Sequence, residues 1–151
     1  MSTVAQPYPR SKPYPTREPR HTIDLRAAIH DAATRATLAV GLGGIAVIHA
    51  VDSVGKWSET RYMFWMYMAL IVTSIALAAA TLFHRSRATF LAAAGLAATV
   101  MAGFVVNRTV GLPGAMDDIG NWTEPLGLAS LVVEGMVVAV GLGGYLARSA
   151  D

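Results

Sequence analysis

Residues 108–127 read RTVGLPGAMDDIGNWTEPLG and join two long apolar segments. The stretch is rich in Gly, Pro, Asp and Asn, which are the residues that form tight turns. The apolar segments on either side are each about 20 residues long, enough to cross a bilayer at 1.5 Å per residue. We therefore predict that residues 108–124 form a structured loop between two membrane-spanning helices.

The rest of the chain continues this pattern. Of its 151 residues, 54% are hydrophobic and only 15% are charged, against about 25% charged residues in a soluble domain. The apolar residues gather in four blocks, at about 36–54, 62–83, 88–107 and 125–146, which lack the polar faces of a soluble bundle. This predicts an all-α integral membrane four-helix bundle, with residues 22–151 as one domain. The chain has no cysteine, which excludes disulfides and thiolate metal sites.

The N-terminal segment 1–21 has a different composition, with five prolines among Tyr, Arg and Ser. Such a segment can neither sustain a helix nor bury a core. We predict a disordered or polyproline-II tail. It would either lie solvated beside anionic lipid or dock on an aromatic groove of a partner. The first helix would begin after Thr22, a favourable N-cap residue.

The basic residues are distributed unevenly between the two sides of the predicted bundle. Three lie on the side of the loops at 53–61 and 108–124: Lys56, Arg61 and Arg108. Nine lie on the side of the tail, the turn at 84–87 and the C-terminus: Arg10, Lys12, Arg17, Arg20, Arg26, Arg35, Arg85, Arg87 and Arg148. The positive-inside rule then places both termini in the cytoplasm. Because these residues flank spans as topology requires, we expect no nucleic-acid binding.

One short sequence occurs twice. LAVGLGG at 38–44 returns as VAVGLGG at 138–144, at similar depth in the first and fourth spans. Glycines at one depth let two membrane helices approach closely. We predict that these two helices pack through Gly41, Gly44, Gly141 and Gly144.

Two ionisable residues, His49 and Glu134, fall inside the apolar spans. A charge there costs about 2.5–3.5 kcal/mol, so such residues are usually functional or paired. At 1.5 Å per residue, His49 lies about 7 Å and Glu134 about 13 Å below the outer boundary. Asp52, Arg108 and Glu124 belong to the same half of the bundle. We predict that these five residues form a polar pocket with the 108–124 loop as its lid.

Three interpretations of this pocket stay open. In the first, Arg108 pairs with Glu134 or Glu124 and His49 bonds to Asp52 or a loop carbonyl, so that the network sets helix register. In the second, His49 with Glu134 or Asp52 binds a metal, either Zn²⁺ or, with help from a methionine such as Met66 or Met101, copper. In the third, His49 and Glu134 form part of a proton or quinone site.

The acidic part of the loop, DDIGNWTE at 117–124, allows two interpretations of its own. Its carboxylates offer oxygen ligands for Ca²⁺. The spacing does not match an EF-hand, and turn formation explains Asp, Gly and Asn equally well. We favour the turn.

The segments Arg108–Pro113 and Glu124–Gly127 together resemble a group of small bacterial four-helix membrane proteins of unassigned function. That group has a His in the first span, R-T-x-G-L-P after the third and E-P-x-G at the start of the fourth. The resemblance covers about residues 36–146 and implies a bacterial cytoplasmic (inner) membrane location. It points to His49, Arg108, Pro113, Glu124 and Glu134 as residues worth mutating. Where the group has a further acidic residue after E-P-x-G, this chain has Ser130, with Glu134 one turn later.

The predicted function follows from small size, little soluble mass and Gly- and Ala-rich helices. We expect a non-catalytic accessory subunit of a larger membrane complex, respiratory or transport-related, with lipid and other membrane subunits or a second copy as partners. The alternative is a metal-binding or proton- and quinone-handling protein that uses His49 and Glu134. The residues identify no cofactor.

Overall fold

The computed structural model describes residues 25–84 and 86–148, and this part of the chain is helical apart from short connections. The long helices are α1 (Leu25–Glu59), α2 (Arg61–Phe83), α3 (Arg87–Thr109) and α4 (Pro125–Ala147), and a 3₁₀ turn, η1 (Met116–Asp118), lies between α3 and α4. Each of the four is long and apolar enough to cross a membrane, so the four long apolar helices that the sequence predicted are found. The predicted tail at 1–21 and the Thr22 cap lie outside the described residues.

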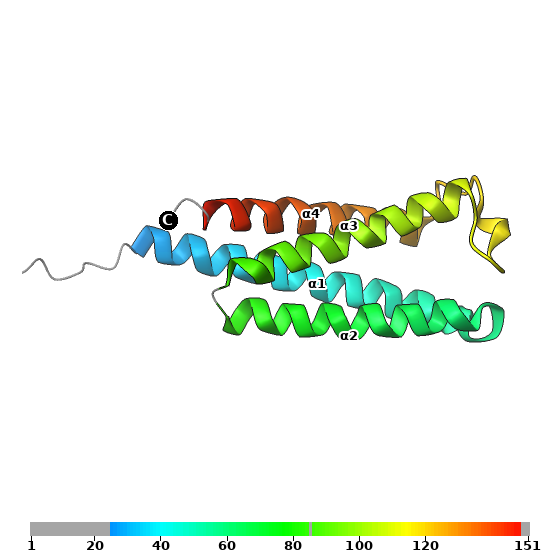
Figure 1. The fold of residues 1–151 in the computed structure, drawn as a ribbon, viewed down its shortest axis with the longest axis horizontal. Coiled ribbons are helices and arrows are strands. Elements are labelled where there is room, and N and C mark those ends of the chain that lie inside the picture. Colours follow the sequence, from blue (N-terminus) through cyan, green and yellow to red (C-terminus); the bar gives the residue numbers. More distant parts are fainter. Residues whose placement is uncertain (1–24, 85, 149–151) are drawn as a thin grey trace, which may run out of the picture.

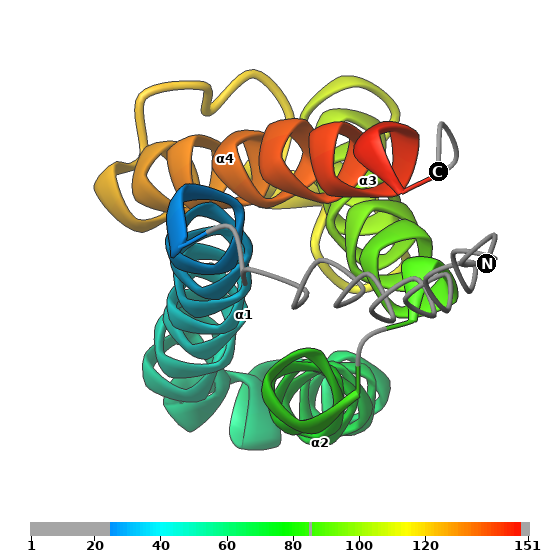
Figure 2. The same ribbon diagram turned by 90° about the vertical axis from the view of Figure 1, so that its left-hand side faces the viewer.

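The helices are arranged around a common centre (Figure 2). α1 packs along both α2 and α4, and α3 packs along α4, whereas α2 and α3 contact each other only sparsely. Figure 1 shows α3 leaning away from α2 towards the end that carries the 110–124 connection. We call this the loop end, and the opposite end, with Leu25 and Ala147, the terminal end.

The first helix extends beyond its predicted apolar span. The predicted polar loop at 53–61 is helical as far as Glu59, and only Thr60 separates α1 from α2. Hydrogen bonds from the Ser53 and Ser58 hydroxyls to carbonyls three residues earlier, and a 3.2 Å ion pair between Lys56 and Glu59, explain why polar residues continue the helix. The loss of hydrophobicity after residue 54 correctly predicted the end of the apolar span, but the helix itself continues to Glu59.

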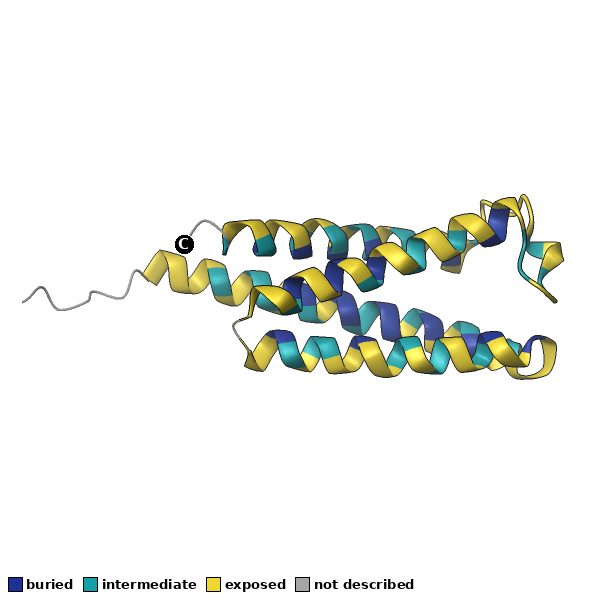
Figure 3. Cartoon of the chain, viewed as in Figure 1, coloured by how far each residue is buried: buried dark blue, intermediate teal, exposed yellow. Residues whose placement is uncertain are grey.

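The apolar core lies in the half of the bundle nearer the terminal end, on the inward faces of the helices (Figure 3). Small side chains on α3 and a single large ring, Phe90, fill the space between α1, α3 and α4. The fully buried members of the core are Leu38, Leu42, Ile45, Phe90, Ala93, Ala97 and Val137.

The glycine repeat packs differently from the prediction. Helices α1 and α4 do lie against each other, but Gly41 and Gly44 receive the side chains of Val137 and Val133 of α4 instead of its glycines. Further along the same inward stripe of α4, Gly141 and Gly144 lie against Phe90 and Ala94 of α3. Gly41, Gly44 and Gly144 thus make room for a large side chain on the neighbouring helix, whereas Gly141 lets the backbones of α3 and α4 approach closely.

Candidate functional site

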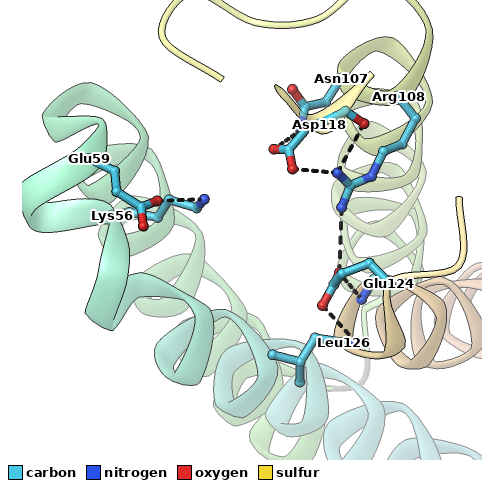
Figure 4. Close-up of polar contacts among 8 residues, drawn as sticks. Lys56, Glu59, Asn107, Arg108, Asp118, Glu124 and Leu126 are labelled. Atoms are coloured by element: carbon cyan, nitrogen blue, oxygen red, sulfur yellow. Dashed lines mark hydrogen bonds and ion pairs between the residues drawn. The ribbon is translucent and has the colours of Figure 1, made fainter. Parts of the chain in front are cut away.

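Arg108, at the end of α3, organises the loop end. Its guanidinium is nearly buried, and Nη1 lies 2.6 Å from Oδ1 of Asp118 and 3.3 Å from the Asp118 carbonyl oxygen. Nη2 lies 3.5 Å from Oε2 of Glu124 (Figure 4). The sequence predicted Glu124 or Glu134 as its partner, and the structure gives Glu124 together with Asp118. Glu134, ten residues further along α4, has a different environment.

Glu124 also begins α4. Its carboxylate accepts hydrogen bonds from the backbone N–H groups of Leu126 (3.0 Å) and Gly127 (2.7 Å). A carboxylate at this position satisfies otherwise unpaired N–H groups and lies at the positive end of the helix dipole. Pro125 follows as the first helical residue, as predicted. The ion pair with Arg108 therefore connects the end of α3 to the beginning of α4.

The 110–124 connection is also hydrogen-bonded to the other half of the bundle. The Tyr62 hydroxyl donates to the Pro113 carbonyl oxygen (2.7 Å), and the Thr60 hydroxyl donates to that of Gly114 (3.1 Å). Gly114 has a positive φ of 77°, a conformation that glycine adopts without strain. The connection thus crosses from α3 and α4 to the junction of α1 and α2. No local pattern predicts these contacts, because the residues they join are 51 and 54 positions apart in the chain.

Asp118 bonds the middle of the 110–124 connection to the end of α3. Its Oδ2 accepts a hydrogen bond from the Asn107 amide at 2.9 Å, while Oδ1 pairs with Arg108. Partial burial raises the pKa of Asp118, but these hydrogen bonds and the positive charges of Arg108 and Lys56 outweigh it, so the pKa lies below its ordinary value. The Asp118 oxygens are therefore used within the protein, which favours the turn over the Ca²⁺ interpretation.

A cavity of about 570 Å³ lies between the helices beneath this connection. Its volume is within the range of small-molecule sites. All four helices contribute to its wall, and so do all five residues that the sequence singled out: His49, Asp52, Arg108, Glu124 and Glu134. Met66 and Tyr67 line it as well, whereas Met101 is not among the lining residues.

Glu134 is the most deeply buried polar group of the wall, with no exposed surface. The Ser130 hydroxyl donates to its Oε1 at 2.5 Å, one helical turn away. Its Oε2 makes no hydrogen bond within the protein. The i,i+4 spacing of Ser130 and Glu134 was visible in the sequence and is the signal that could have predicted this pair.

His49 lies near Glu134, close enough for the two to interact electrostatically. Its Nδ1 lies 2.9 Å from the Ile45 carbonyl oxygen, and its ring meets the Tyr67 ring edge-on at 5.1 Å. The predicted bond to Asp52 or a loop carbonyl is therefore replaced by a bond within α1, and Asp52 interacts with the Tyr67 hydroxyl instead. Because a carbonyl only accepts, Nδ1 carries a proton.

Two further wall residues have unsatisfied polar atoms. Oδ1 of Asn107 and Nε of Arg108 are buried and make no hydrogen bond within the protein. A buried polar atom without a partner costs about 1–3 kcal/mol. Together with Oε2 of Glu134, three such atoms border one cavity, which is the arrangement expected of a site for a polar ligand group.

The cavity reaches the side of the bundle between α2 and α3. Thr73 of α2 and Thr99 and Gly103 of α3 line it and are also exposed on the outside. Both threonine hydroxyls bond to carbonyls of their own helices, and a Cβ on Gly103 would meet no other atom within 4 Å. This opening is therefore largely apolar, and it faces the lateral surface of the four apolar helices.

The donor atoms around the cavity suit an organic ligand better than a metal ion. Within residues 25–84 and 86–148, no group of three or more His, Asp or Glu side chains is placed to hold a metal. The Arg108 guanidinium shares the wall with His49 and Glu134, and its positive charge opposes a cation.

The chain was compared with protein-family models, curated proteins and solved structures, and none of them matches. The similarity to small bacterial four-helix membrane proteins therefore remains a prediction from the motifs.

Proposed function

We propose that this protein is a non-catalytic integral membrane subunit whose cavity binds the oxygen-bearing head group of a lipid-soluble molecule, of which a quinol is an example. The observation that carries this proposal is Glu134, a fully buried carboxyl with one unpartnered oxygen on a cavity of about 570 Å³. Burial of a polar group without a partner is costly. A ligand that bonds to Glu134 removes this cost.

The chemistry of the wall favours hydroxyl groups on the ligand. Ser130 donates to Oε1 of Glu134 and leaves Oε2 without a partner, and Oδ1 of Asn107 is an unpartnered acceptor. Nε of Arg108 is the unpartnered donor. A quinol hydroxyl can both donate and accept, so it can bond to each of these atoms, whereas a quinone oxygen only accepts and cannot bond to Oδ1 of Asn107.

The route of entry favours a lipid-soluble molecule. The cavity opens between α2 and α3 through Thr73, Thr99 and Gly103, away from the helix ends. If the four helices span a membrane, this opening faces the acyl chains. A ligand with an apolar tail then enters sideways and leaves its tail among the lipids.

The cellular setting is part of the same proposal. The distribution of Lys and Arg supports cytoplasmic termini, and the resemblance supports the bacterial cytoplasmic membrane. A role as accessory subunit of a respiratory or transport complex agrees with a site that holds a lipid-soluble molecule. The metal-binding alternative has less support, because the described helices and loop bring together no ligand cluster.

Equilibrium binding of a benzoquinol with a decyl tail to the protein in nanodiscs tests the proposal. We expect saturable binding at one site, preference for the quinol over the quinone, and about tenfold weaker binding by Glu134→Gln. Glutamine retains the size of the side chain and replaces one carboxyl oxygen by an amide nitrogen.

The matched control is Ser74→Ala. Ser74 is a buried polar residue with an unpartnered hydroxyl that lies outside the cavity wall. The Ser74→Ala protein should bind the quinol as tightly as the unmodified protein does. Binding that does not saturate, or that is equal in all three proteins, would overturn the proposal.

A further inference from the structure

A second hollow, of about 1040 Å³, lies at the terminal end, away from the cavity described above. The first turns of α1, the start of α3 and the last turns of α4 border it, and Figure 2 looks onto this end of the bundle. It is a groove open to the outside, at the depth where the helices leave their apolar segments. The proposed function does not use it.

The groove carries a net positive charge. Among residues 25–84 and 86–148, three arginines and one carboxylate, Asp31, border it, which gives these residues a formal charge of +2 with His30 counted as neutral. Oδ2 of Asp31 lies 3.1 Å from Nε of Arg35, and Oδ1 is paired with Arg148. The carboxylate is thus already compensated by two guanidinium groups. The basic residues that line the groove are Arg26, His30, Arg87 and Arg148.

Two of these arginines are held in place by aromatic rings. The Arg148 guanidinium lies 4.0 Å from the centre of the Phe90 ring and donates to the Gly144 carbonyl oxygen at 3.1 Å. The Arg87 guanidinium lies 6.0 Å from the centre of the Tyr145 ring. Stacking on a ring orients a guanidinium while leaving its edge available for an anion. Two positive charges are therefore held in place where α3 and α4 border the groove.

The floor of the groove is apolar. It consists of Val140, Gly143, Gly144 and Ala147 of α4. Gly143 is exposed, and a Cβ there would meet no other atom within 4 Å. The floor continues from the basic rim along a helix that is long and apolar enough to cross a membrane. An occupant with a negative head and an apolar chain matches both parts.

We propose that this groove binds one anionic phospholipid. The phosphate lies between Arg26 and Arg87, and an acyl chain follows α4 over Gly143. Basic pockets between membrane helices on the cytoplasmic side are suited to anionic head groups. A free phosphate would use the arginines alone and leave the apolar floor without a role.

Native mass spectrometry of the full chain, titrated in detergent with phosphatidylglycerol or phosphatidylcholine, tests this. We expect one phosphatidylglycerol to bind at concentrations where phosphatidylcholine does not. The double variant Arg26→Gln, Arg87→Gln should bind it about 25-fold more weakly, since each basic residue near a lipid surface contributes about fivefold. Arg148 is left unchanged because it also pairs with Asp31.

Arg61→Gln is the matched control, because Arg61 also stacks on a ring, that of Trp57 at 5.0 Å, but at the loop end. It should leave phosphatidylglycerol binding unchanged. Equal binding of the two lipids, or equal loss in the control and the double variant, would overturn the proposal. So would displacement of the lipid by millimolar inorganic phosphate, which would identify a site for free anions. These outcomes are independent of quinol binding at Glu134.

Discussion

Along one face of α1, Leu38, Leu42 and Ile45 are buried in the apolar core, and one turn later His49 borders the polar cavity. The same change occurs along α4, in the opposite direction. Its buried positions are Gly127, Ser130 and Glu134 in the half towards the loop end, then Val137, Gly141 and Gly144 towards the terminal end. Each helix thus has one continuous inward stripe, whose chemistry changes near the middle of the bundle.

The comparison shows how one bundle combines a closed half and an open half. In the terminal half, glycine and alanine let α3 and α4 close around Phe90. In the loop half, α3 leans away from α2 (Figure 1), and Arg108 with its carboxylate partners holds the helix ends together. Close packing stabilises the first half, whereas ion pairs and hydrogen bonds across the loop end stabilise the second and leave a cavity beneath.

Removal of the Arg108 charge should have the largest effect on stability. Loss of one partner from a buried ion pair costs about 3–5 kcal/mol. The side chains of Asp118 and Glu124 are 27% and 33% exposed, so water can solvate them in part when Arg108 is lost. We therefore expect Arg108→Gln to lower the free energy of unfolding by a smaller amount, about 2–3 kcal/mol. Unfolding in mixed micelles with increasing SDS measures this value.

Arg61→Gln is again the control, here for the stability of Arg108→Gln. This exposed residue also lies at the loop end, and a cation–π contact of its kind contributes about 0.5–1 kcal/mol. If Arg108→Gln cost no more than Arg61→Gln, the loop half would be held together by something other than the Arg108 ion pairs.

An added methyl group at Gly141 should destabilise the closed half. Its Cβ would lie 2.9 Å from the Phe90 carbonyl oxygen and 3.2 Å from the Ala94 nitrogen, so the backbone of α3 must move. We expect Gly141→Ala to cost about 1–3 kcal/mol by the same SDS measurement. Gly143→Ala, two residues away in open space, should be neutral or up to about 1 kcal/mol stabilising, because alanine favours a helix. Equal effects of the two changes would mean that α3 and α4 are not in close contact.

The number and limits of the long helices could be predicted because they depend on local hydrophobicity. The predicted spans at 62–83, 88–107 and 125–146 agree with α2, α3 and α4 within about three residues. The helical continuation to Glu59 was missed, because polar residues such as Ser53 and Ser58 bond back to their own helix and mimic a loop in composition. The glycine repeat showed that α1 and α4 are neighbours, but not which side chain fills each gap.

The members of the candidate site could be predicted, and most of their bonds could not. A charged residue in an apolar span is conspicuous, so His49, Glu134 and Arg108 were identified from the sequence and line one cavity. Their partners depend on how the 110–124 connection folds back over the bundle. Asp118 was assigned to a turn, and its bonds to Arg108 and Asn107 require three-dimensional positions that no spacing rule provides.

Acid should release the loop end before it affects the closed half, and this is the smallest of the expected effects. The pKa of Asp118 is lower in the folded protein than its ordinary value of 3.8, so its stabilising contribution is complete above that pH and is lost as pH falls through the lower, folded-state value. Fluorescence of Trp122, in a background with Trp57 and Trp65 replaced by Phe, should stay constant from pH 7 to about pH 4 and change below it. Asp118→Asn should abolish this transition and give the acid-form signal at every pH. A transition that persists in Asp118→Asn would assign the acid response to another carboxyl group, and the loop end would then not depend on the charge of Asp118.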